Sequence, residues 1–242
     1  MPPQHGAWGF LALPLVLGIA AAGWSFWLIP LAIAWVAAYP TSWALTGLLT
    51  ARRPERFRRA AVIWLPICVV AGVPVLITHP WLGWLLAVYL LLFLVNVQQA
   101  KARRERSMFN DLVLIVECAL LVPIVAGVVG GGFPPEQMAV VLTAMTACAL
   151  TLVGSTLHVK SLIRERANPV FTYVSQAFAV ACVPVMAVTS WLAGQSLWLA
   201  VPFGLLAVRA WWWHRPDWRP VLIGMGELAG LLVVAGPAIF LL

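Results

Sequence analysis

Three polar stretches interrupt a chain that is otherwise apolar, and each suggests chemistry at the end of a helix. The first lies at the N-terminus, where Gln4, His5 and Trp8 precede a long apolar run. His5 is the titratable side chain of this stretch, and an imidazole can carry protons or donate to a phosphate near neutral pH. We therefore take His5 as a candidate catalytic residue and Gln4 and Trp8 as candidate ligand-binding residues, the alternative being a polar cap on an interfacial helix.

The second stretch runs from Asn96 to Asp111. Asn96, Gln99 and Arg103 are spaced by three and four residues, which predicts one face of a helix that leaves the membrane. Amides that lead to an Arg cluster suit an anionic head group or a diphosphate, because guanidinium forks match phosphate oxygens. The alternative is a basic loop in which Asn110 or Asp111 caps the next helix. We expect Asp111 to act as a proton carrier and the following residues to bind the ligand: Asn96, Gln99, Lys101, Arg103, Arg104, Arg106 and Asn110.

The third stretch begins near His158, a candidate catalytic residue at the mouth of the sixth apolar run. The spacing of Thr156, Lys160 and Arg164 by four residues predicts a single helical stripe. A satisfied interfacial histidine is the alternative for His158, and Glu165 can pair with an Arg of another loop. The candidate ligand-binding residues here are Lys160, Arg164, Glu165 and Arg166.

Two acids, Glu117 and Glu227, lie deeper inside apolar runs. An ionisable group within a bilayer is costly, so it usually faces the bundle interior, stays protonated or meets a cation. Both are therefore functional candidates, although either can also serve as a structural partner of an Arg or of a neighbouring helix.

The elements that position these residues are membrane spans. The 242 residues are 63% hydrophobic and 10% charged, with a mean hydropathy of +0.96, which excludes a soluble globular protein. A spanning helix needs about 20 mostly apolar residues. The apolar runs cover residues 6–23, 26–48, 60–78, 81–98, 111–129, 137–157, 170–190, 196–213 and 220–242.

The distribution of charge tests this count of about nine spans. When loops are assigned alternately to the two sides, all 15 Lys and Arg residues fall on one side, as expected for cytoplasmic loops. We predict one all-α transmembrane domain over residues 1–242 in the bacterial inner membrane, with a cytoplasmic N-terminus and an external C-terminus. The net charge of +7 then indicates contact with anionic membrane lipids and not with nucleic acid. The four cysteines lack metal-ligand spacing, so we expect no metal site there.

Several motifs carry a family resemblance. The opening Gln-His-Gly-Ala-Trp, the Asn96-to-Asp111 segment and residues 159–166 together resemble the YwiC-like family of bacterial membrane proteins. More distantly, the chain resembles the UbiA superfamily of intramembrane prenyltransferases, a resemblance that implies nine helices and a diphosphate held through magnesium by aspartate-rich motifs. Residues 39–59 contain no aspartate, so we do not expect prenyl transfer by the usual magnesium-dependent route.

Together these observations predict a UbiA-like helix bundle that binds an anionic amphiphile, an isoprenoid diphosphate or a phospholipid, in a cavity open to the cytoplasmic leaflet. Such a protein would be an enzyme if it transferred a group on that lipid. A proton- or cation-coupled transporter that uses Glu117 and Glu227 is the alternative, and a non-catalytic membrane partner is a third reading. The expected cavity-lining residues are His5, Asn96, Arg104, Asp111, His158, Lys160 and Arg164.

Overall fold

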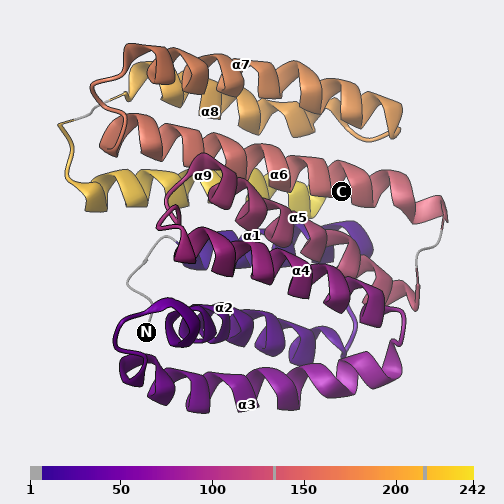
Figure 1. Ribbon diagram of the computed structural model, residues 1–242. Helices are drawn as coiled ribbons and strands as arrows, with labels where there is room; N and C mark the ends of the chain where they lie inside the picture. Colours follow the sequence, from indigo (N-terminus) through magenta and orange to yellow (C-terminus); the bar gives the residue numbers. More distant parts are fainter. Residues whose placement is uncertain (1–6, 133–134, 215–216) are drawn as a thin grey trace. The chain divides into compact units, whose positions relative to one another are not determined.

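The computed structural model describes residues 7–132, 135–214 and 217–242, and every regular element in these ranges is a helix (Figure 1). In chain order the elements are α1 (Ala7–Ala22), α2 (Leu28–Thr50), α3 (Glu55–Thr78), α4 (Leu82–Lys101), α5 (Met108–Gly130), α6 (Pro135–Ile163), α7 (Pro169–Leu192), the 3₁₀ turn η1 (Leu197–Ala200), α8 (Val201–Trp212) and α9 (Pro220–Leu241).

Seven of the described helices, α2 to α7 and α9, are long and apolar enough to cross a membrane. The first helix and the η1–α8 segment are shorter but also apolar. Large apolar side chains are exposed along α3 and α4, among them Val70, Ile77 and Trp84 at 73%, 71% and 83%. Lipid tails, and not water, suit such a surface. The chain is therefore an all-α polytopic membrane protein, as the sequence predicts.

Each predicted apolar run coincides with a described helix, but the helices extend further at several ends. α3 begins at Glu55 and not at residue 60, and α6 continues to Ile163 and not only to residue 157. The reason is that a helix keeps its own hydrogen bonds beyond the end of an apolar run. Lys160 follows the predicted run at residues 137–157 but lies within α6, as its spacing of four residues from Thr156 predicts.

The contacts within the described residues divide into two compact units, which are described separately. Unit 1 contains Trp24–Glu117 and Gly127–Gly132, and so includes α2, α3, α4 and parts of α5. α2 packs along α3, where Gly47 leaves room for the ring of Phe57. The Phe57 ring also lies 4.9 Å from that of Trp43, measured between centroids. The predicted single domain over residues 1–242 stays a prediction.

Unit 2 contains α1, Cys118–Ala126 of α5, and the helices from α6 to the C-terminus. Its packing follows α6 against α7, α7 against α8, and α9 against α1, α6 and α8 (Figure 1). Leu17, Leu152 and Met186 are fully buried between these helices. This packing brings together α6, α8 and α9, the three helices of unit 2 whose polar side chains form the site described next.

Candidate functional site

A buried ion pair joins α8 to α9. Arg209 Nη1 lies 3.1 Å from Glu227 Oε1, and Arg209 Nη2 donates to Glu227 Oε2 at 3.2 Å. Two parallel contacts of this kind make a bidentate fork, the strongest arrangement of a guanidinium and a carboxylate. The two side chains are only 12% and 11% exposed. A charge pair is thus held away from water inside the membrane-spanning part of the chain, where unpaired charges are costly.

The backbone of α9 leaves room for this guanidinium. Arg209 Nη1 also donates to the carbonyl of Gly226 at 3.2 Å. One turn further along, a Cβ at Gly230 would come within 2.8 Å of the same nitrogen. Because Gly230 has no side chain, the guanidinium can lie directly against the helix backbone. The Gly226 carbonyl and the missing side chain of Gly230 therefore help to position Arg209.

His158 on α6 is the third member of the cluster. Its Nε2 lies 3.9 Å from Glu227 Oε1, a separation longer than a hydrogen bond but short enough for a strong electrostatic interaction. Ser155, one turn earlier on α6, hydrogen-bonds to the Glu227 carboxylate. Within the described ranges, the buried atoms His158 Nδ1 and Arg209 Nε have no hydrogen-bond partner. Both retain the capacity to bind another polar group.

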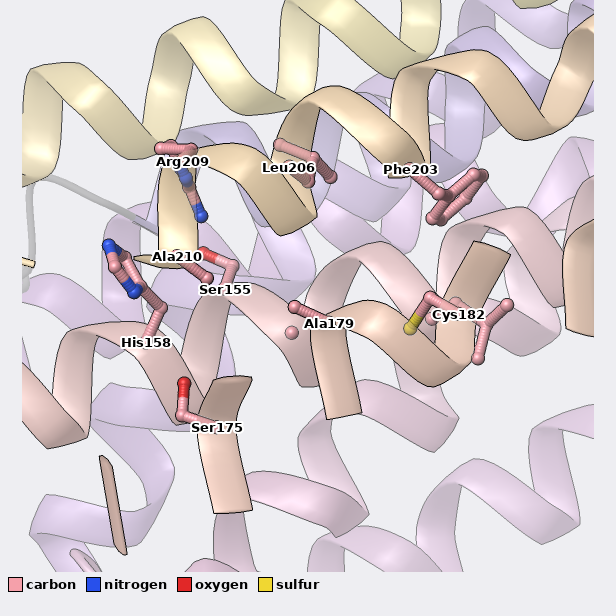
Figure 2. Close-up of a pocket in the computed structure, with 11 residues that line it drawn as sticks. Ser155, His158, Ser175, Ala179, Cys182, Phe203, Leu206, Arg209 and Ala210 are labelled. Atoms are coloured by element: carbon pink, nitrogen blue, oxygen red, sulfur yellow. The ribbon is translucent and has the colours of Figure 1, made fainter. Parts of the chain in front are cut away.

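A small cavity adjoins His158 and Arg209. Figure 2 shows His158, Ser155 and Arg209 around its polar end, while Cys182 and Phe203 line the apolar end. Its volume is about 20 Å³, enough for one water molecule. The cavity can therefore hold one water molecule beside His158 and Arg209.

A second histidine connects the cluster toward the end of α8. His214 follows α8 and is half-buried, and its ring centroid lies 6.4 Å from that of His158, at an interplanar angle of 67°. Burial lowers the pKa of the His214 imidazole below its ordinary value, so the ring is neutral at neutral pH. A neutral imidazole carries one free lone pair that can accept a proton.

An open groove of about 460 Å³ lies where α7 begins and α8 ends. Arg166, Tyr173 and Trp211 contribute to its walls, together with Gln176. The Gln176 side chain donates to the carbonyl of Ala210 at 3.2 Å, and Ala210 also lines the small cavity beside His158. This hydrogen bond therefore separates the open groove from the buried cluster.

Unit 1 contains an independent polar pair. The Asn96 side chain on α4 donates to Glu117 Oε1 on α5 at 2.8 Å. The Tyr89 hydroxyl donates to the Glu117 backbone carbonyl at 2.6 Å, and its ring lies edge-to-face with Trp35, 6.2 Å between centroids. The Asn96 amide and the Tyr89 hydroxyl, both on α4, therefore join this helix to α5 at Glu117.

Comparison with known proteins identifies the family. The sequence model of the YwiC-like proteins matches residues 1–126. The chain belongs to the YwiC-like family. It is 29% identical to the uncharacterized protein YwiC of Bacillus subtilis over 238 residues, which cover 94% of this chain and 92% of the relative. An uncharacterized protein of Haemophilus influenzae is 26% identical over 227 residues, covering 93% and 91%. No solved structure matches, so the resemblance to the UbiA superfamily stays a prediction.

In this YwiC-like chain, the predicted N-terminal site falls mostly outside the described residues, which do not include Gln4 and His5. Trp8 lies on α1 and is 43% exposed. The role assigned to these residues stays a prediction.

The segment after α4 differs from the predicted helical face. α4 ends at Lys101, and Arg103 adopts a left-handed backbone with φ of 56°, so the face through Asn96, Gln99 and Arg103 is wrong beyond Gln99. The basic residues of this segment are exposed: Lys101, Arg103, Arg104 and Arg106.

The cap of α5 also differs from the prediction. Ser107 is the N-cap, and its hydroxyl accepts from the backbone N–H of Asn110 at 3.2 Å. Capping by Asn110 or Asp111 is therefore wrong, because both residues lie within the first turn of α5. The Asn110 side chain instead donates to the carbonyl of Glu105 at 3.1 Å.

The predicted stripe on α6 is correct only in part. His158 and Lys160 are buried on α6, but the helix ends at Ile163, so Arg164 and Glu165 lie beyond it. Arg164 and Arg166 are exposed, and Glu165 is half-buried. Of the cavity predicted between the polar stretches, the described members belong to two units: Asn96, Arg104 and Asp111 to unit 1, and His158, Lys160 and Arg164 to unit 2. That shared cavity stays a prediction.

The main residue that the sequence reasoning missed is Arg209. The charge rule counts it only as one of the basic residues near the cytoplasmic end of the eighth run, whereas it lies inside α8 and pairs with Glu227. One signal marks it: Arg209 precedes the Trp211 to Trp213 cluster, and such aromatic clusters sit at the membrane interface. An Arg on the apolar side of that cluster needs a buried anion, and Glu227 is the acid of the next span.

Proposed function

We propose that this protein is a proton-coupled carrier of an anionic substrate, in which Glu227 binds the proton and Arg209 binds the anion. The observation that carries the proposal is the buried Arg209–Glu227 fork with His158 beside it, formed by three helices of a membrane protein. Ionisable groups buried within membrane spans commonly serve ion pathways and proton relays. This proposal corresponds to the transporter that the sequence analysis gave as an alternative function.

Electrostatics explains why proton and anion would move together. With Glu227 deprotonated, the Arg209–Glu227 pair is neutral as a whole and leaves no charge exposed to the low-dielectric interior. A proton on Glu227 removes the counter-ion of Arg209, and an incoming anion restores neutrality. An anion that arrived without the proton would compete with the Glu227 carboxylate and add a net negative charge. Coupling then follows from the cost of an unpaired buried charge.

The small cavity beside His158 fits the unloaded state of such a carrier. A volume of about 20 Å³ admits a water molecule but no larger anion. Loading would therefore require Arg209 to leave Glu227 and the wall of α7 and α8 to open. The Gln176–Ala210 hydrogen bond, which lies between this cavity and the open groove, is the contact that would break first.

Transport into proteoliposomes tests this proposal. Purified protein is reconstituted with a pH-sensitive dye inside, and inorganic phosphate or succinate is added outside under an imposed proton gradient. We expect anion-dependent acidification of the interior by the wild-type protein and its loss in Glu227→Gln, while the exposed Glu55→Gln behaves like wild type. Equal proton flux in wild type and Glu227→Gln would refute the role of Glu227. A non-catalytic membrane partner would move neither ion.

A second candidate function is favoured by the open groove. Binding of an anionic amphiphile, an isoprenoid diphosphate or a phospholipid, would place its phosphate near Arg166 and its tail among the exposed apolar side chains of the spans. The aromatic rings of Tyr173 and Trp211 in the groove suit the boundary between head group and tail.

Lipid analysis distinguishes this second function. Lipids that co-purify with the detergent-solubilised protein are identified by mass spectrometry for wild type, Arg166→Ala and the exposed control Arg52→Ala. An anionic lipid that is enriched in wild type and in the control, and lost in Arg166→Ala, would support the groove as its site. The same lipids in all three preparations would argue against it.

A further inference from the structure

Two histidines and Glu227 form a series that leads from the end of α8 into the buried cluster. His214 follows α8 and is half-buried, while His158 is 5% and Glu227 9% exposed. We infer that His214, His158 and Glu227, in that order, form the path by which protons reach Glu227. This inference rests on the proposed function, since it names the entry route to the proton site of the carrier.

The distances suit stepwise transfer. The rings of His214 and His158 lie 6.4 Å apart between centroids and meet edge to face, a gap that one bridging water can span. His158 Nε2 lies 3.9 Å from Glu227 Oε1, so the two atoms need to approach by about 1 Å to form a hydrogen bond. Rotation of one side chain about a terminal torsion supplies such a movement, because these torsions are broad.

His158 has the arrangement of a relay. Its Nε2 faces the Glu227 carboxylate, which favours the tautomer protonated at Nε2, and its buried Nδ1 has no partner among the residues described. A proton that arrives from His214 binds at Nδ1, and the proton on Nε2 then passes to Glu227 Oε1. The N–H bond of a His214 ring that has taken a proton from water breaks as the Nδ1–H bond of His158 forms. The Nε2–H bond of His158 then breaks as the O–H bond of Glu227 forms, so both histidines and Glu227 end neutral. Rotation of the ring restores the starting tautomer.

The charged and titratable groups around His158 favour passage of the proton over storage. α9 contributes Glu227, α8 contributes the Arg209 guanidinium, and the segment after α8 contributes His214. α7 contributes Cys182 to the cavity wall, while α1 and η1 carry no titratable side chain. A lasting positive charge on His158 is disfavoured beside Arg209. The protonated form of His158 is therefore short-lived and transfers its proton to the nearest base, Glu227.

Time-resolved infrared spectroscopy of the full-length protein in lipid tests the path. The readout is the protonated-carboxyl band that is lost in Glu227→Gln, followed after a jump within the range of about pH 4 to 9, which brackets ordinary carboxyl and imidazole pKa values. We expect His158→Gln and His214→Gln to slow the appearance of this band by about a hundredfold, the lower end of what a positioned proton-transfer group contributes. Its final amplitude at low pH should stay the same.

Two controls separate a relay from a structural role. His79→Gln removes a buried histidine of unit 1 that hydrogen-bonds to its own helix, and it should leave the rate unchanged. Free imidazole added to a His214→Gly variant should restore the rate, since a diffusing base can replace a missing relay but cannot repair packing.

These experiments test the proton path separately from the proposed carrier function. A wild-type rate in His214→Gln would overturn the path, even if Glu227→Gln had abolished anion-coupled proton flux and so upheld the carrier. The path would be supported if the carboxyl band formed slowly in both histidine variants, reached its full amplitude, and formed faster again when imidazole was added. This result would hold whether or not phosphate or succinate is the transported anion. Spectra of wild type and Glu227→Gln that coincide at every pH would overturn the path, because Glu227 would then never change its protonation.

Discussion

Arg209 and Glu227, which are 18 residues apart in the chain, meet as a two-point fork within unit 2, with Nη1–Oε1 at 3.1 Å and Nη2–Oε2 at 3.2 Å. Neither residue has an oppositely charged partner on its own helix. The pair therefore ties α8 to α9 by charge, together with the hydrogen bond from Arg209 to the Gly226 carbonyl. Its energetic role depends on both partners being present, because either charge alone would be stranded away from water.

Removal of one partner should destabilise the protein more than removal of both. Glu227→Leu leaves Arg209 buried without a counter-ion, and we expect a loss of about 3–5 kcal/mol in the free energy of unfolding. The double variant with Arg209→Met and Glu227→Leu should recover most of this loss. Equilibrium unfolding in mixed detergent micelles measures both. A double variant less stable than Glu227→Leu would show that the fork contributes net stability and would contradict this expectation.

A side chain at Gly230 should displace the guanidinium. In Gly230→Ala the new Cβ would meet Arg209 Nη1 at 2.8 Å and Leu206 Cδ2 at 3.1 Å, so we expect a loss of about 1–3 kcal/mol, typical of overpacking. Gly224→Ala is the matched control on the same helix, because nothing lies within 4 Å of its added Cβ. Similar unfolding midpoints for the two variants would mean that Arg209 moves aside without cost.

The elements that carry these residues could be predicted, but their pairing could not. Hydropathy located α9 and the intramembrane position of Glu227, since an acid in an apolar run stands out in the sequence. Hydropathy does not report which helices are neighbours, so the partner of Glu227 stayed open. The rule that places Lys and Arg on the cytoplasmic side groups Arg209 with the other basic residues. A basic residue near the end of an apolar run satisfies this rule whether its side chain faces water or pairs with a buried acid.

The same holds for unit 1. The sequence marks Asn96 by its spacing from Gln99 and Arg103, and Glu117 as an acid within an apolar run. The structure joins these two residues. The sequence offered no link between them, because the hydrogen bond depends on how α4 and α5 cross. The backbone turn at Arg103 was equally hidden, since residues other than glycine adopt a positive φ only where their surroundings impose it.

The stability of the protein should depend on pH through His214. Burial lowers the pKa of this imidazole in the folded state, so the unfolded chain binds a proton more readily. The stabilising effect of the neutral ring is complete above the unfolded value of about 6.5 and is lost as the pH falls toward the folded pKa. We expect unfolding midpoints of His214→Gln to fall less than those of wild type upon acidification. Parallel curves for wild type and His214→Gln would contradict this linkage.

The Asn96–Glu117 hydrogen bond should stabilise the contact between α4 and α5. Asn96→Leu removes the donor that lies 2.8 Å from Glu117 Oε1 and leaves a half-buried acid without this partner, a change that costs about 1–3 kcal/mol. Gln99→Leu, on the same helix and also half-buried, is the control for added apolar surface. Glu117→Gln should keep most of the stability, because its amide oxygen can still accept from Asn96. If Glu117→Gln were as damaging as Asn96→Leu, the carboxylate charge and not the hydrogen bond would be the stabilising feature.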